Sequence, residues 1–199
     1  MYQKYVKRSL DVIFASILAL IILLPLIFIA IWIKLDSKGP IFFKQKRAGK
    51  SLEPFMIYKF RTMTTDAPKD CPTEHLKNAG NFITRSGRVM RKLSIDELPQ
   101  LINVLIGNMS IVGPRPGLLV QEDLIFERAK YGANDFNPGI TGWAQVNGRD
   151  EVSIEEKGKL DGEYVENFGF IMDSKCIVKT LSAVLSSKGH KEGHEKERG

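Results

Sequence analysis

The 199-residue sequence lacks most of the motifs by which a function is usually recognised. It has only two cysteines, Cys71 and Cys176, which lie far apart and match no metal-ligand spacing such as CxxC. Neither a disulfide framework nor a cysteine metal site is indicated, and isolated thiols suit a reducing cytosolic setting. The Walker loop and GxGxxG are also missing, which disfavours the chemistry of ordinary kinases and dinucleotide enzymes.

Signatures of nucleic-acid binding are missing as well. The net charge is +6, but there is no helix-turn-helix, RNP or zinc-finger pattern, so no nucleic-acid partner is expected. His190 and His194 stand four apart without the HExxH pattern, in a polar tail (residues 189–199) that we expect to be disordered. The first 50 residues carry nine basic side chains against two acidic ones. Basic charge beside an apolar run indicates a membrane with anionic lipids.

That apolar run covers residues 12–33, which are 22 residues without a charge. A helix of this length extends about 33 Å, close to the thickness of a bilayer core. The run is too long for the apolar part of a signal peptide, and no small-residue cleavage site follows it. We therefore expect a membrane anchor over residues 1–36.

Two features bear on how this anchor meets the bilayer. Basic residues flank both of its ends, namely Lys4, Lys7 and Arg8 on one side and Lys34, Lys38 and Lys44 on the other. The positive-inside rule then places both ends in the cytoplasm, and Pro25 within the run is expected to kink or break a helix. A bent re-entrant hairpin satisfies both observations, although prolines also occur in true transmembrane helices. The residues alone leave a re-entrant segment and a single span as equal alternatives.

The remainder predicts a mostly helical α+β catalytic domain over residues 37–188. Two short alternating runs, residues 40–46 and 55–63, predict a β-hairpin, and residues 64–80 predict a surface loop. Apolar residues at helical spacing, followed by Gly107 as a stop signal, predict a helix on Leu98, Leu101, Ile102 and Leu105. A second stripe, capped by Asp173 or Ser174, predicts an amphipathic helix on the core or the membrane surface at Ile177, Leu181, Val184 and Leu185.

The densest cluster of chemically capable side chains lies within residues 85–115. Two adjacent acids, Asp96 and Glu97, stand at the start of the predicted helix. One interpretation is structural: Ser94 and Glu97 form a capping box, and Asp96 complements the helix dipole. This interpretation leaves the cations around the acids unexplained, which are Arg85, Arg88, Arg91, Lys92 and Arg115.

These cations give the acids a second, chemical interpretation. Together with a helix N-terminus they make a site for a highly charged phosphate ligand. Carboxylates beside a pyrophosphate imply a divalent cation, and Mg²⁺ is the usual choice for oxygen ligands. In such a site Asp96 can attack phosphorus and form an aspartyl-phosphate intermediate.

Four motifs, in this order, resemble those of the bacterial monotopic phosphoglycosyl transferases. They are KFRTM at residues 59–63, LSIDELPQL at 93–101, GNMSIVGPRP at 107–116 and PGITGWAQVNGR at 138–149. With the apolar segment, the resemblance covers nearly everything from residue 1 to about 188. Several long motifs in the right order are far more specific than one short pattern.

The resemblance implies transfer of a phosphosugar from a nucleotide diphosphate sugar, with a lean to uridine, onto polyprenyl (undecaprenyl) phosphate. UMP would leave, and the product would enter exopolysaccharide or glycoconjugate assembly. Asp96 would be the nucleophile, Glu97 its acid/base or metal partner, and both would hold Mg²⁺. Substrate binding is implied for Arg88, Arg91, Pro114, Arg115, Pro116, Gly142, Gln145 and Arg149.

The resemblance also implies a re-entrant helix on the cytoplasmic face of the inner membrane, broken at a Ser-Pro pair. This chain has Leu24-Pro25 there instead. Arg61, Arg149, Asp161 and Asp173 stay open between a site role and a local structural one, and a homodimer is neither indicated nor excluded. Two other functions remain as alternatives: a membrane-associated Mg²⁺-dependent pyrophosphatase or phosphodiesterase, and a noncatalytic membrane scaffold.

Overall fold

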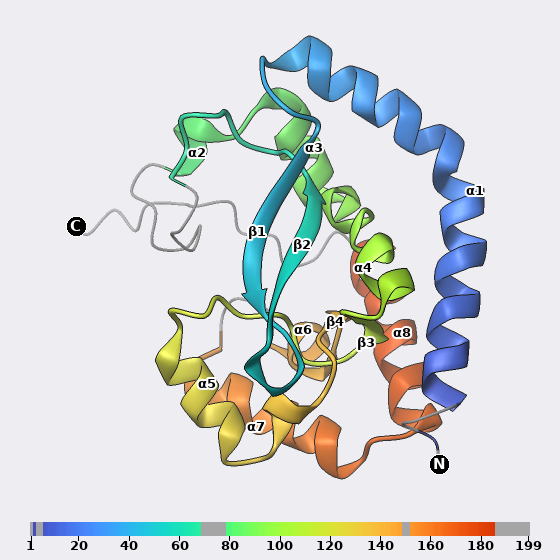
Figure 1. The fold of residues 1–199 in the computed structure, drawn as a ribbon, viewed down its shortest axis with the longest axis vertical. Helices are drawn as coiled ribbons and strands as arrows, with labels where there is room; N and C mark the ends of the chain where they lie inside the picture. Colours follow the sequence, from blue (N-terminus) through green and yellow to red (C-terminus); the bar gives the residue numbers. More distant parts are fainter. Residues whose placement is uncertain (1, 3–5, 69–78, 149–151, 186–199) are drawn as a thin grey trace.

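The computed structural model describes residues 2, 6–68, 79–148 and 152–185. Helices dominate this part of the chain, and the strands form two small sheets (Figure 1). The helices are α1 (Lys7–Asp36), α2 (Ala79–Phe82), α3 (Arg85–Lys92), α4 (Gln100–Ile106), α5 (Glu122–Ala129), α6 (Trp143–Asn147), α7 (Ile154–Glu166) and α8 (Phe170–Leu185). The strands are β1 (Phe42–Ala48), β2 (Pro54–Phe60), β3 (Ser110–Val112) and β4 (Gly139–Thr141). The predicted α+β class is confirmed.

The predicted β-hairpin is strands β1 and β2, which pair antiparallel from Phe42↔Phe60 to Ala48↔Pro54. Because side chains alternate along a strand, Gln45, Arg47 and Lys59 share one face of this hairpin. The outer backbone of β2 is covered by Asn103 of α4, which accepts from the Tyr58 amide at 3.0 Å and donates to the Met56 carbonyl at 2.7 Å. These bonds hold the hairpin beside the segment that carries the two acids.

A two-stranded parallel sheet brings the third and fourth motifs together. Its strands β3 and β4 pair as Ser110↔Gly139 and Val112↔Thr141. The chain continues from each strand in close contact, since the Gly113 amide donates to the Thr141 carbonyl at 2.9 Å. A Cβ at Gly142 would lie 2.1 Å from the Gly113 carbonyl oxygen, so this approach requires glycine.

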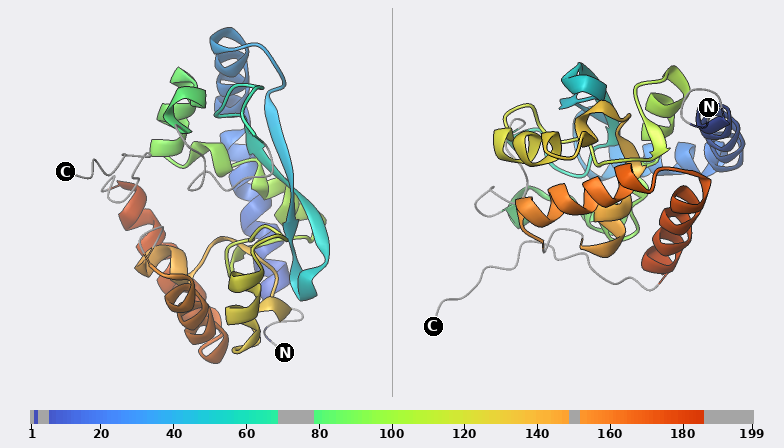
Figure 2. Two further views of the ribbon diagram at one scale, coloured as in Figure 1. Left: turned by 90° about the vertical axis from the view of Figure 1, so that its left-hand side faces the viewer. Right: turned by 90° about the horizontal axis from the view of Figure 1, so that it is seen from below.

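The long helix α1 runs beside the catalytic body along its whole length (Figures 1 and 2). One stripe of α1 packs on two apolar clusters, with Ala15 in the first and Ile33 in the second. Most of the remaining surface is apolar and exposed, and by length and composition the helix is able to cross a membrane. Of the two outcomes expected at Pro25, a kink or a break, the structure shows the first: the helix continues through Pro25 without a break and is bent. Packing against the body holds both halves helical, although proline removes one backbone hydrogen bond.

The N-terminal end of α1 is fixed to the body by charged side chains. Lys7 binds Asp173 of α8 at 2.8 Å. Arg8 donates to the Val104 and Leu105 carbonyls at 2.5 and 2.9 Å, at the C-terminal end of α4. Asp11 accepts from the Ser110 hydroxyl at 2.7 Å and from the Ile111 amide at 3.0 Å.

The C-terminal end of α1 is fixed to the same body. Asp36 accepts from the backbone amide and the hydroxyl of Ser86, both at 2.8 Å, and so joins α1 to the start of α3. Arg61 is buried and donates to the carbonyls of Ser37 at 2.8 Å and Lys38 at 2.5 Å. A cation at the C-terminal end of a helix donates to free carbonyls there and interacts favourably with the negative end of the helix dipole. Arg61 therefore holds the end of α1.

Helix α8 begins at Phe170, so the expected cap at Asp173 or Ser174 is wrong and Asp173 lies in the first turn. Asp173 is buried and accepts a hydrogen bond from the Tyr164 hydroxyl at 2.8 Å as well as the Lys7 ion pair. Asp173 is therefore bound to two side chains from other parts of the fold and does not cap the helix. Among the described side chains of α8, four large apolar ones are exposed, namely Phe170, Ile171, Val178 and Leu181, and the exposed Lys175 and Lys179 lie beside them.

Candidate active site

The two acids lie in a 3₁₀ turn, η4 (Ile95–Glu97), between α3 and α4. The capping-box interpretation of this segment is wrong. Ser94 is in the left-handed region with φ 55° and makes no side-chain cap, and α4 begins only after Pro99. The Ser94 hydroxyl therefore does not cap the first free amides of a helix, and Asp96 and Glu97 are not part of a capping box.

Glu97 is the more strongly bound acid. Its carboxylate accepts from the Lys59 ammonium at 2.7 Å and from two nitrogens of the Arg115 guanidinium at 2.8 and 3.4 Å. Burial alone would raise the pKa of Glu97, but the charges of Arg115 and Lys59 outweigh burial and hold this pKa below its ordinary value. Glu97 is therefore ionised and fixed in orientation.

Asp96 has the opposite electrostatic character. Burial raises the pKa of its carboxyl and the adjacent Glu97 charge adds to this, while Lys59, Arg91 and Arg115 oppose it. Within the described residues, the Asp96 side chain accepts no hydrogen bond. A carboxylate that is partly desolvated and not tied down is a suitable nucleophile.

Lys59 is the site residue to which sequence reasoning assigned no role. It lies 38 positions before Glu97 in the chain, and only the β1–β2 hairpin brings it to the acids. Burial lowers the pKa of Lys59, and the Glu97 charge opposes that shift. Its presence in the KFRTM motif was the one available signal.

The other predicted binding residues lie at different distances from the two acids. Arg91 lies near Asp96 and is held by a bond from its Nε to the Thr62 hydroxyl at 2.9 Å, whereas Arg88 is exposed on α3. Gly142 and Gln145 make contacts with the backbone of neighbouring segments: Gly142 packs on Gly113, which directly precedes the Pro-Arg-Pro segment, and Gln145 donates to the Ile140 carbonyl at 3.0 Å. Arg149 falls outside the described residues.

The residues left open by the sequence have structural partners. Asp161 is 1% exposed and pairs with Arg128 at 2.7 Å, Asp173 pairs with Lys7, and Arg61 holds the end of α1. The hydrogen bonds and ion pairs of these three residues do not include Asp96 or Glu97. Each therefore supports the framework around the site.

The donor set suits one kind of metal ion. Magnesium is commonly held by one or two carboxylates while substrate phosphates and water complete its shell. Asp96 and Glu97 would supply those carboxylates, and the part of the chain that the structure describes holds no group of three or more His, Cys, Asp or Glu that could hold a metal. The residues thus fit Mg²⁺ shared with a phosphate ligand better than a closed protein site.

Comparison with known proteins identifies the family. The family model for bacterial sugar transferases matches residues 2–187. The chain belongs to this family. An uncharacterized sugar transferase of Bacillus subtilis, EpsL, is 43% identical over 183 residues, covering 92% of this chain and 89% of the relative. The exopolysaccharide production protein PSS of Rhizobium leguminosarum is 40% identical, covering 90% and 95%. A UDP-glucose:undecaprenyl-phosphate glucose-1-phosphate transferase of Caulobacter vibrioides is 37% identical, covering 91% and 70%.

Proposed function

We propose that this sugar transferase moves a phosphosugar from a UDP-sugar to undecaprenyl phosphate, through a covalent intermediate on Asp96, with UMP as the leaving product. The observation that carries the proposal is the contrast between the two acids. Glu97 is locked by Lys59 and Arg115, while its neighbour Asp96 is desolvated and accepts no hydrogen bond among the described residues. One carboxylate is thus fixed as a support, and the other is available to react.

In the first step an Asp96 carboxylate oxygen attacks the phosphorus that bears the sugar. The bond from this phosphorus to the bridging oxygen breaks, and UMP leaves with that electron pair. In the second step a phosphate oxygen of undecaprenyl phosphate attacks the same phosphorus and releases Asp96 as a carboxylate. Because both substrates use one pocket in turn, ping-pong kinetics are expected.

The cations stabilise the charge that develops in these steps. Lys59, Arg91 and Arg115 all lie close enough to Asp96 to oppose the rise in its pKa, and the same fields act on phosphoryl oxygens placed beside it. Arg115 is 47% exposed and presents a planar donor fork suited to phosphate. Mg²⁺ held by Asp96 and Glu97 would supply further charge neutralisation for the diphosphate.

We further propose that α1 is a re-entrant anchor whose two ends lie on the cytoplasmic face of the membrane. Lys7 and Arg8 at one end, and Asp36 at the other, bind a single catalytic body that lies along the helix. If α1 crossed the bilayer, this body with its buried charges would have to enter the hydrocarbon region, at a large cost. The exposed apolar side chains of α8 suit the same interface.

A panel of UDP-sugars with undecaprenyl phosphate, scored by UMP release, tests the function. Wild-type protein quenched without the lipid acceptor should carry a sugar-phosphate adduct on the peptide that contains Asp96. Sugar phosphate released into water without any lipid acceptor would instead favour the hydrolase alternative. Failure to release UMP from any UDP-sugar, with intact fold, would contradict the proposal.

A further inference from the structure

The loop formed by residues 114–117, here called the PRP loop, is held through its carbonyl oxygens. Its two prolines have no backbone N–H, so the loop has little means of bonding to itself. Instead, four consecutive carbonyls accept from four separate donors. These are Gly139 N to Pro114 O at 2.9 Å, Arg128 Nη1 to Arg115 O at 2.9 Å, Arg47 Nη1 to Pro116 O at 3.3 Å, and Ala48 N to Gly117 O at 3.0 Å.

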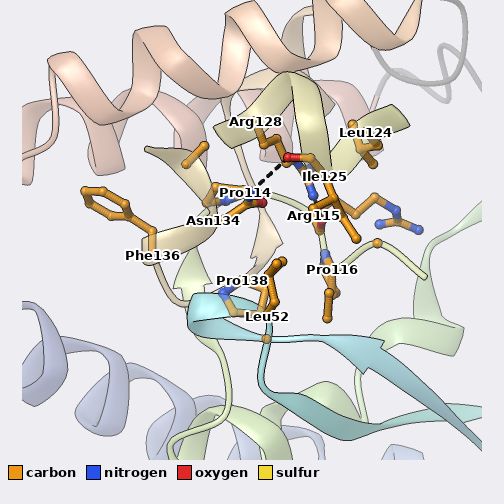
Figure 3. Close-up of a pocket in the computed structure, with 14 residues that line it drawn as sticks. Leu52, Pro114, Arg115, Pro116, Leu124, Ile125, Arg128, Asn134, Phe136 and Pro138 are labelled. Carbon is orange, nitrogen blue, oxygen red and sulfur yellow. Dashed lines mark hydrogen bonds between the residues drawn. The ribbon is translucent and has the colours of Figure 1, made fainter. Parts of the chain in front are cut away.

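The donor to Arg115 is itself fixed in the core. Arg128 is 8% exposed, and its Nε donates to Asp161 of α7 at 2.7 Å. A guanidinium is a rigid planar fork, so a carboxylate on one edge fixes where the other edge points. Figure 3 shows Arg128 beside Arg115 in the pocket between α5 and the end of the hairpin, with Pro114 and Pro116 in the same loop.

Arg115 is consequently bound at both of its ends. Its carbonyl is held by Arg128, and its guanidinium by Glu97. Moving the backbone of Arg115 would move the guanidinium relative to Glu97 and to any phosphate beside Asp96. A displacement of about 1 Å in such a group can cost on the order of 10²-fold in rate.

A buried arginine–aspartate pair is weak evidence for a role in stability alone. Apolar residues of similar volume often stabilise a core equally well, because two charges must be desolvated to form the pair. What this pair provides beyond burial is geometry, because the same guanidinium also donates to the Arg115 carbonyl of the loop.

We infer that Arg128, oriented by Asp161, is a positioning residue that sets the location of Arg115 during phosphosugar transfer. This inference rests on the proposed function. Arg128 does not touch the reacting atoms and acts through the backbone of Arg115. The role is distinct from that of Arg91, which lies near Asp96 itself.

A double-mutant cycle on the full chain tests the inference, with UMP release as kcat/KM for the UDP-sugar. Arg128→Met should lower kcat/KM by about 10²-fold in the wild-type background. In an Arg115→Met background the same change should have almost no further effect, because the group that Arg128 positions is already gone. Arg128→Lys should lie between, since an ammonium cannot span Asp161 and the carbonyl as a fork does.

Lys130→Met is the matched control, because Lys130 directly follows α5, the helix that carries Arg128, and forms an exposed pair with Glu127. It should leave kcat/KM unchanged in both backgrounds. Melting temperatures identify any variant that fails to fold, and if Arg128→Met does, the cycle is run with Arg128→Lys.

Two results would overturn the inference in an active enzyme. One is a wild-type kcat/KM in Arg128→Met or Arg128→Lys, and the other is a decrease in kcat/KM by the same factor whether or not Arg115 is present. A wild type that releases no UMP from any UDP-sugar refutes the proposed function, and the inference with it.

Discussion

Asp96 and Glu97 are neighbours in the chain, yet the fold should respond in opposite ways when each is neutralised. Glu97 accepts short bonds from Lys59 at 2.7 Å and Arg115 at 2.8 Å. A hydrogen bond to a charged group contributes about 1.5–3 kcal/mol. In a domain of this size 1 kcal/mol corresponds to about 2–4 °C, so Glu97→Gln should lower the melting temperature by roughly 3–12 °C.

Asp96→Asn should instead leave the melting temperature unchanged or raise it. Burial raises the pKa of Asp96, which means that the fold disfavours its ionised form. This penalty is absent below the unfolded pKa and grows as the pH rises toward and past the folded pKa, so the amide becomes more favourable relative to the carboxyl as the pH rises. Activity should nevertheless fall by several orders of magnitude, because an amide cannot replace a nucleophilic carboxylate.

Thermal unfolding of the full chain in detergent, paired with single-turnover UMP release, measures both effects. The loss of melting temperature in Glu97→Gln should shrink as the pH falls. Because the folded pKa of Glu97 is lowered, its ionised form contributes full stability above the unfolded pKa, and this contribution is lost as the pH falls toward the folded pKa. A loss of melting temperature in Asp96→Asn as large as that in Glu97→Gln would refute the electrostatic reasoning. Retention of more than about a tenth of wild-type turnover would refute covalent catalysis by Asp96.

Three further outcomes are expected. Turnover should stop in excess EDTA and return with added Mg²⁺, and full activity in the chelator would contradict the metal assignment. Cysteines placed at the exposed positions Ser9 and Lys38 should both resist an impermeant maleimide in intact cells and react after permeabilisation, whereas labelling of one end from outside would contradict the re-entrant anchor. Burial, reinforced by the nearby Asp173 charge, raises the pKa of the Cys176 thiol to about 12. In a Cys71→Ser background, the native protein should therefore be alkylated very slowly at about pH 8, and rapid alkylation would contradict a packed thiol.

The features predicted correctly from the sequence depend on local patterns. The hairpin follows from alternation, and the helix that ends at Gly107 follows from its apolar spacing and a glycine stop. The structure confirms both: Gly107 has φ 99°, and its amide donates to the Asn103 and Val104 carbonyls. The resemblance likewise named Arg91 and Arg115, which the fold places near the acids.

The features that sequence reasoning missed depend on contacts between distant segments. Lys59 meets Glu97 across 38 positions, and Arg128 meets Asp161 across 33, and neither pair has a short-range pattern. The capping box failed because Ser94 adopts a left-handed conformation, which the tetrapeptide pattern does not reveal. Which of the two outcomes expected at Pro25 occurs, a kink or a break, also depends on tertiary packing, which keeps α1 helical through the proline.

The contacts along α1 mean that the proposed membrane anchor is also a part of the folded core of this enzyme. Ala15 and Ile33 are fully buried members of the two apolar clusters that α1 covers, and Asp11 and Asp36 bind backbone amides in the body. A version cut before Phe42 to obtain a water-soluble enzyme would open both clusters and leave those amides without their acceptors. Removal of α1 and loss of the native state should therefore occur together, and a detergent that preserves activity must cover the exposed surface of α1 without replacing its contacts with the protein.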